Sequence, residues 1–226
     1  MKKIVYKSSK SVMIKETIYF KGRKQMTNHY YSKTPDTAHE YAHWDFELKG
    51  KLFHFATDSN VFSKGTVDYG SRVLIDAFDA TDLPDGPILD LGCGYGPIGL
   101  SLAYDTKRLV EMVDVNERAL ELAQKNADKN QIETVEIHSS YIYETLNHTA
   151  YAAILSNPPI RAGKQVVHEI LEKSAALLLP GGTLTIVIQK KQGAPSAQKK
   201  MLETFGNAEI IVKDRGYYII QSVKEA

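Results

Sequence analysis

The chain has 226 residues, 43% of them hydrophobic, and a formal net charge of +1. This length suits one α/β domain and is too short for two comfortable ones. The single cysteine excludes an internal disulfide framework, which fits a reducing cytoplasm. No apolar run reaches the ~18–20 residues that a membrane span needs. We therefore expect a cytoplasmic protein that binds no membrane.

Positive charge is concentrated at the start of the chain. Residues 1–25 hold eight basic residues and one acid, a balance of +7, which leaves about −6 for residues 26–226. A basic arm can hold phosphates without sequence preference. Alternatively, Met26 is the true start and residues 1–25 are an extension outside the fold. We expect the folded domain to occupy residues 26–226 in either case.

Residues 39–43, His-Glu-Tyr-Ala-His, match the H-E-x-x-H motif of zinc proteases. That motif needs a sustained helix, with both imidazoles on one face and a third ligand beyond it. Pro35 lies just upstream, and the alternation of apolar residues that begins at Trp44 indicates a strand instead. We interpret the match as coincidence and expect no metal site.

Residues 44–56 predict a β-hairpin, and only short elements are expected in the rest of the chain before the first parallel strand. A polar loop with one aromatic residue, Phe62, follows the hairpin. A helix is then expected from about residue 71 to 78, with Asp68 or Ser71 as its N-terminal cap.

A glycine-rich turn comes next, after an apolar run that predicts a buried strand ending at Asp90. Gly92, Gly94 and Gly96 let the backbone turn sharply and approach a ligand more closely than a side chain would allow. Pro97 suits the first turn of a helix, where its missing N–H would be unpaired anyway. This strand-to-helix turn predicts a site for a nucleotide-like cofactor.

Two interpretations of the turn compete. The run Gly94–Gly99 reads G-x-G-x-x-G, and Asp114 lies about 20 residues further on, as in nicotinamide dehydrogenases. The wider pattern, in which Asp90 precedes G-x-G-x-G, resembles motif I of class I S-adenosylmethionine-dependent methyltransferases. Cys93 lies inside the loop and is expected to be a small packing residue rather than a nucleophile.

The rest of the chain alternates strands and helices, which predicts a doubly wound, Rossmann-like α/β fold. We expect a mostly parallel seven-stranded sheet with an antiparallel C-terminal strand pair, preceded by the N-terminal hairpin. Ligands then bind at the carboxyl ends of the strands, near the switch in strand order. The expected strands are 109–113, 135–137, 151–155, 183–188, 209–213 and 217–223, and the expected helices are 116–130, 165–179 and 198–205.

Two further residues are expected to contact the cofactor. Asp114 ends a strand beside the glycine turn, where a carboxylate can accept two hydrogen bonds from a ribose diol. At the next strand end, class I methyltransferases often place an Asp or Asn against the adenine amino group. This chain has Ser140 there, so a hydroxyl or backbone contact would have to substitute.

Asn157, Pro158 and Pro159 follow a strand and decide between the two interpretations. The prolines fix φ and remove N–H groups, and Pro158 biases Asn157 toward an extended conformation. The corner is expected to present the Asn157 amide oxygen and the Pro158 carbonyl as two acceptors for the N–H bonds of an sp² amino group. The nitrogen lone pair is then aimed at an electrophilic methyl. These three residues are our catalytic candidates for amine methylation.

Asp90–Gly96, Asp114 and Asn157–Ile160 together resemble the class I methyltransferases that modify amino groups. Residues 61–64 and 68–72 more specifically resemble the RNA guanine-N2 methyltransferases of the small ribosomal subunit, the RsmC-like family. The resemblance covers most of the chain. It implies S-adenosylmethionine as cofactor, guanine N2 as the methylated group, and ribosomal RNA or the small ribosomal subunit as partner.

The chain departs from that family at Ile160, where the family's pattern has Phe after the prolines. An aromatic ring there would stack on the target base, so the stacking role is expected to pass to Phe62, unless Phe62 is a core residue of its loop. Lys64, Ile160 itself and Arg161 lie on loops at the same edge and are further candidates for substrate binding. Lys164, Lys190 and Lys191 extend this positive rim, onto which RNA could dock.

Three alternatives remain open. A protein-glutamine methyltransferase uses a similar Asn-Pro-Pro corner, although a helical substrate-binding domain would then be expected upstream. A methyltransferase of DNA or tRNA base amines performs the same chemistry on another polymer. A non-catalytic RNA-binding protein is the third alternative, and the intact glycine turn with Asn157 argues against it.

Overall fold

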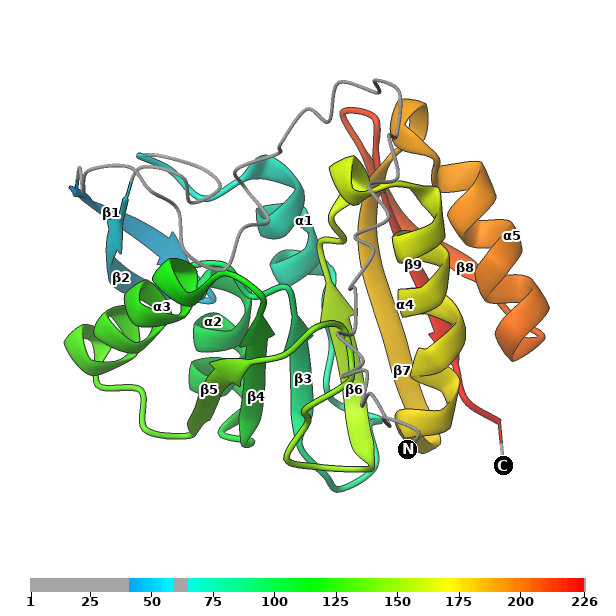
Figure 1. Ribbon diagram of the computed structural model, residues 1–226, viewed down its shortest axis with the longest axis horizontal. Helices are drawn as coiled ribbons and strands as arrows, with labels where there is room; N and C mark the ends of the chain where they lie inside the picture. Colours follow the sequence, from blue (N-terminus) through cyan, green and yellow to red (C-terminus); the bar gives the residue numbers. More distant parts are fainter. Residues whose placement is uncertain (1–40, 59–64, 226) are drawn as a thin grey trace, which may run out of the picture.

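A computed structural model describes residues 41–58 and 65–225. The two sheets in this part of the chain are a separate hairpin and a seven-stranded sheet of order β5-β4-β3-β6-β7-β9-β8 (Figure 1). The hairpin consists of β1 (Ala42–Leu48) and β2 (Lys51–Thr57). The seven strands are β3 (Ile88–Leu91), β4 (Val110–Asp114), β5 (Val135–Ser139), β6 (Tyr151–Ser156), β7 (Leu178–Gln189), β8 (Glu209–Asp214) and β9 (Tyr217–Val223).

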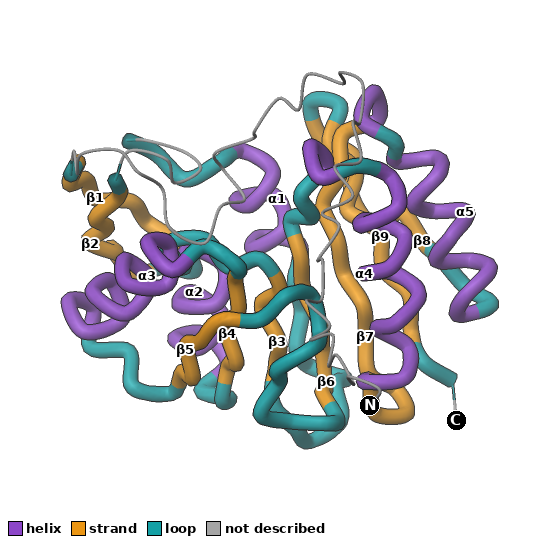
Figure 2. The backbone as a smooth tube through the Cα atoms, in the orientation of Figure 1, coloured by secondary structure: helices purple, strands orange, loops and turns teal. Residues whose placement is uncertain are grey.

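Helices cover both faces of the seven-stranded sheet (Figure 2). Side chains of α1, α2, α3 and the hairpin share one hydrophobic core with one face of the sheet. Side chains of α4 and α5 form a second core on the other face. The helices are α1 (Tyr69–Ala77), α2 (Pro97–Thr106), α3 (Glu117–Asn130), α4 (Lys164–Leu177) and α5 (Ala194–Phe205), with short 3₁₀ turns η2 (Ile160–Ala162) and η3 (Lys190–Gln192).

Strands β3 to β7 run parallel, and β9 pairs antiparallel with both β7 and β8. The predicted fold class is therefore confirmed, hairpin and closing strand pair included. The order of strands reverses at β3, which lies between β4 and β6. The carboxyl ends of these three strands, Leu91, Asp114 and Ser156, consequently meet at one edge of the sheet, where ligands bind in folds of this kind.

Two predicted boundaries were wrong. The turn at residues 180–182 was expected to separate a helix from a strand, but β7 runs through it. Gly181 N donates to Lys224 O, and Lys224 N donates to Gly182 O, each at 2.8 Å, so a C-terminal residue pairs with this segment, although Gly181 has a φ of +78° and the register with β6 shifts here. Helix α5 starts at Ala194 rather than 198, because Pro195 fits its first turn.

Two asparagines of α3 fasten the hairpin to the rest of the domain. Asn130 accepts from His54 N at 2.8 Å and donates to His54 O at 2.9 Å. Asn126 pairs in the same way with Ala56, at 2.7 and 3.1 Å, and donates to Tyr95 O in the glycine turn at 2.9 Å. The side chains thus act as a partner strand for β2, and the hairpin is held beside the glycine turn.

Several sequence predictions concern residues outside the described ranges. The basic arm of residues 1–25, Met26 and the first residues of the H-E-x-x-H match lie there, so the predicted domain start stays a prediction. His43, the last residue of the match, lies in strand β1 rather than in a helix. Among the described residues, no helix is long and apolar enough to cross a membrane.

Candidate active site

The glycine turn leaves open space at the end of β3. Gly92 and Cys93 both donate N–H bonds to Val113 O, at 2.8 and 3.0 Å, which pins the turn to β4. Gly92 and Gly94 have φ values of +79° and +57°, and a Cβ atom on either would meet nothing within 4 Å. Gly99 differs, because a Cβ atom there would meet the Met112 side chain at 2.6 Å. The first two glycines therefore face a free volume, and the last allows α2 to pack on β4.

Asp90 lies behind this turn and is fully buried. Its Oδ2 accepts a hydrogen bond from Gly99 N at 2.7 Å, while Oδ1 has no partner among the described residues. Burial, opposed by the Gly99 hydrogen bond and aided by the charge of neighbouring Asp114, raises the pKa of Asp90 to about 7. A buried carboxylate with one unsatisfied oxygen is stabilised by a cation or donor brought close to it.

Asp114 ends β4, beside the glycine turn as predicted. Its Oδ1 accepts from Asn116 N at 2.9 Å and its Oδ2 accepts from Gly94 N at 3.0 Å. Burial raises the pKa of this carboxyl, although its backbone hydrogen bonds oppose the shift. The two N–H groups fix the carboxylate in one orientation, and each oxygen keeps a lone pair for a ligand.

Ser140 follows β5 at the same edge but turns its side chain inward. Its hydroxyl donates to Ile142 O at 3.2 Å and accepts from Thr145 N at 3.2 Å, and its backbone N–H donates to Asp114 O. The side chain is buried. Ser140 thus shapes the turn next to Asp114, and its contact with a cofactor stays a prediction.

The Asn157-Pro158-Pro159 corner follows β6 directly. Ser156 Oγ donates to Leu91 O at 2.8 Å, which ties the end of β6 to the end of β3. The Asn157 amide nitrogen donates to Asp68 Oδ2 at 3.0 Å and to Ser71 Oγ at 3.1 Å. Because both of its N–H bonds are used, the amide offers a ligand only its oxygen.

The remaining predicted substrate residues fall in different places. Phe62 and Lys64 lie outside the described residues. Ile160 is half-buried in η2 and packs against the core on the α4 side, while Arg161 is exposed beside it. Arg161 therefore lies near the edge at which β6 ends, and the substrate-binding roles of all four residues stay predictions.

A group of aromatic and basic side chains at this edge was not predicted. The Arg72 and Arg215 guanidinium groups lie over the Tyr69 ring, 4.8 and 5.1 Å from its centroid. The Tyr69 hydroxyl donates to Asp214, which raises the pKa of the phenol. Sequence patterns indicated only a turn at residues 214–216, and no local feature showed that α1 would pack against it.

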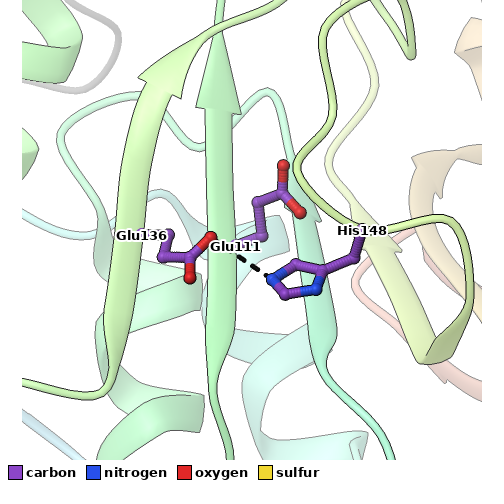
Figure 3. A group of neighbouring side chains, drawn as sticks. All are labelled: Glu111, Glu136 and His148. Atoms are coloured by element: carbon purple, nitrogen blue, oxygen red, sulfur yellow. Dashed lines mark hydrogen bonds and ion pairs between the residues drawn. The ribbon is translucent and has the colours of Figure 1, made fainter.

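Cys93 and a cluster of two glutamates and one histidine have structural roles. Burial raises the pKa of the Cys93 thiol, so it is a packing residue, as expected, and a poor nucleophile. Glu111, Glu136 and His148 bring potential metal-ligand atoms within 4.8 Å of one another (Figure 3). Glu111 and Glu136 lie near the amino ends of β4 and β5, away from the glycine turn. The protein itself, however, supplies three donors to the buried Glu111 carboxylate: His138 Nε2, Asn147 N and the Tyr151 hydroxyl, at 2.6 to 2.7 Å. We interpret this cluster as a hydrogen-bond network that fixes the loop between β5 and β6.

Known proteins similar to this chain include methyltransferases. The uncharacterized protein YbxB of Bacillus subtilis is 53% identical over 201 residues, which cover 88% of this chain and all of YbxB. Ribosomal RNA small subunit methyltransferase C of Actinobacillus pleuropneumoniae is 28% identical over 70% of the chain, and the large subunit methyltransferase G of Aeromonas salmonicida is 28% identical over 84%. The chain spans 48% and 51% of those two proteins.

A solved structure shares the fold. The 16S rRNA N2 G1207 methyltransferase of T. thermophilus, in complex with AdoMet and guanosine, superposes with a TM-score of 0.73 at 24% identity. The superposition covers 82% of this chain and 51% of that one. The methyltransferase small domain family matches residues 52–221, which include the glycine turn and the Asn-Pro-Pro corner. The chain belongs to the methyltransferase small domain family.

Proposed function

We propose that this protein transfers a methyl group from S-adenosylmethionine to an exocyclic amine, namely guanine N2 in the RNA of the small ribosomal subunit. The observation that carries the proposal is the Asn157 amide. Its nitrogen is held by Asp68 and Ser71, which leaves its oxygen to accept a hydrogen bond from an amine. Family membership favours S-adenosylmethionine over a nicotinamide cofactor as the ligand of the glycine turn.

The residues around the glycine turn fit S-adenosylmethionine. When bound, this cofactor supplies an electrophilic methyl group. The buried Asp90 carboxylate, with its unsatisfied oxygen, suits the ammonium group of the methionine part. The space in front of Gly92 and Gly94 admits a ligand, and Asp114 can accept the hydrogen bonds of a ribose diol. No pyrophosphate has to be held in this arrangement.

The Asn-Pro-Pro corner would hold the amine. Asn157 Oδ1 and the Pro158 carbonyl accept its two N–H bonds and aim the lone pair at the methyl carbon. Positive charge develops on the nitrogen as the new bond forms, so these two acceptors bind the transition state more strongly than the ground state. The bond between the methyl group and the cofactor sulfur would break with its electron pair left on sulfur, and the nitrogen would then release its proton to water, so a strong general base is not needed.

Basic side chains support RNA as the polymer that carries the amine. Arg161, Lys164, Lys190 and Lys191 are exposed on segments that follow the carboxyl ends of β6 and β7. They can neutralise phosphates around the site, with Phe62 and Lys64 as further proposed contacts. Relatives that act on ribosomal RNA agree with this choice, and action on that RNA would place the protein in the cytoplasm.

Cofactor affinity should depend on the protonation of Asp90. Because the pKa of Asp90 is about 7 in the free protein, lowering the pH adds a proton there that a cationic cofactor must displace. We expect the Kd for S-adenosylmethionine to rise by about tenfold from pH 8 to pH 6. Calorimetry on wild type and Asp90→Asn checks this, since the variant retains the titration of the cofactor and of Asp114 but loses that of Asp90. Equal slopes in the two proteins would contradict the role of Asp90.

The substrate can be identified by methyl transfer from labelled cofactor. Undermodified small subunits, large subunits, naked ribosomal RNA, tRNA and DNA are assayed in parallel, followed by mass spectrometry of the nucleosides. We expect N2-methylguanosine in RNA of the small subunit. Methylated glutamine in a ribosomal protein, or label confined to DNA, tRNA or the large subunit, would overturn the proposed substrate.

A further inference from the structure

The first turn of α1 meets the catalytic corner, although the two are far apart in sequence. Asp68 caps this helix, with its Oδ2 accepting from Ser71 N at 3.1 Å. The same oxygen accepts from Asn157 Nδ2 at 3.0 Å, and Ser71 Oγ lies 3.1 Å from that nitrogen. Asp68 is half-buried and Ser71 is buried. The amide nitrogen therefore faces two acceptors on one rigid element.

These contacts determine which way the amide points. A carboxylate can only accept hydrogen bonds, so it tolerates the nitrogen of Asn157 at this distance and repels the oxygen. Rotating the amide by half a turn would set Asn157 Oδ1 against Asp68 Oδ2 and lose the hydrogen bond to the carboxylate, although the Ser71 hydroxyl could then donate to Oδ1. Among the described residues, no donor reaches Asn157 Oδ1 itself. The orientation that leaves this oxygen available is thus imposed from α1.

Helix α1, whose first turn imposes this orientation on the Asn157 amide, is itself held in place by the turn between β8 and β9. The Tyr69 hydroxyl donates to Asp214 at the end of β8, and the rings of Tyr69 and Tyr217 lie 5.6 Å apart. Gly70 permits this approach, because a Cβ atom there would stand 2.8 Å from the Tyr217 ring. The first turn of α1 is consequently held between the β8–β9 turn and the catalytic corner.

We propose that Asp68 and Ser71 are positioning residues, which orient the Asn157 amide so that its oxygen accepts from the target amine. The expected kinetic effect rests on the proposed amine methylation, whereas the orientation of the Asn157 amide does not depend on it. Neither residue has to touch the substrate. They act by preorganising the acceptor, and a small misplacement of a catalytic group can cost on the order of 10²-fold in rate.

Asp68→Asn is the sharpest kinetic test, because asparagine caps a helix as well as aspartate does and yet no longer forces the amide orientation. We expect kcat to fall by about 10–100-fold, with KM for RNA and Kd for cofactor changed less than about twofold. Asp76→Asn, an exposed change on the same helix, should leave all three unchanged. In an Asn157→Ala background, Asp68→Asn should have no further effect. An equal loss in both backgrounds would overturn the proposal.

A second measurement does not depend on the substrate. The side-chain amide signal of Asn157 in ¹H–¹⁵N NMR spectra of the full chain, identified by its absence in Asn157→Ala, should be shifted from the position of an exposed amide. Asp68→Asn or Ser71→Ala should move it toward that position. A wild-type signal that neither variant moves would refute the positioning role. If the signal is shifted and the variants move it, but the protein methylates no nucleic acid, the positioning role stands and the proposed function is refuted.

Discussion

Asn157→Ala is expected to reduce turnover by roughly 10²–10³-fold, the range for removing one preorganised polar contact from a transition state. Affinity for S-adenosylmethionine should hardly change, because the proposed role of the Asn157 amide is to accept from the amine and not to hold the cofactor. Methyl transfer to undermodified small subunits gives kcat, and calorimetry gives the cofactor Kd.

The matched control is Gln165→Ala, which removes an exposed carboxamide at the start of α4, on the same edge of the sheet. It should retain wild-type turnover. The melting temperature of each variant separates loss of catalysis from loss of structure. Full activity in Asn157→Ala would contradict both the proposed chemistry and the interpretation of the Asn-Pro-Pro corner.

The parallel part of the fold could be predicted because its signals are local. Each strand is a short apolar run ending in a polar or glycine-rich turn, and several helices carry a local start signal, such as the Asn116 cap before α3 and Pro97 in the first turn of α2. The start of β7 could not be predicted in this way. Residue 224 pairs with its Pro180–Gly182 segment, and no local sequence pattern indicates this long-range contact.

The parts of the site also differ in whether a local sequence signal marks them. The glycine turn, Asp114 and the Asn-Pro-Pro corner could be found because each follows its own strand and the fold brings strand ends together. The partners of Asn157 could not, because Asp68 and Ser71 precede it by 89 and 86 residues. Sequence indicated Asp68 or Ser71 as the helix cap, and the structure shows that it is Asp68, but a cap pattern contains no information on a second acceptor role.

Ser140 shows a limit of a different kind. Its place at the end of β5 is the predicted one, yet a serine hydroxyl readily bonds to nearby backbone, and here it closes the turn with Ile142 and Thr145. Position in the fold can be read from the sequence, whereas the direction of a short polar side chain depends on such local competition.

Asp114→Ala is expected to weaken S-adenosylmethionine binding by about 3 kcal/mol, or more than a hundredfold in Kd, because two ribose hydroxyls lose a charged acceptor. Each hydrogen bond to a charged group contributes about 1.5–3 kcal/mol, so the lower end of that range already gives this loss. The substitution also releases Gly94 N and Asn116 N, which Asp114 holds in the free protein. Asp114→Asn keeps one acceptor oxygen and should lie between wild type and Asp114→Ala.

Calorimetry with S-adenosylmethionine and with NAD on the same proteins decides what the turn binds. Wild type should bind the first and not the second, and Glu117→Ala, which removes an exposed carboxylate from the first turn of α3, should bind as wild type does. Unchanged affinity in Asp114→Ala would show that the carboxylate only fastens the glycine turn to α3. Comparable binding of NAD would instead restore the dinucleotide interpretation of Gly94–Gly99, since a pyrophosphate also binds where helix N–H groups face a glycine turn.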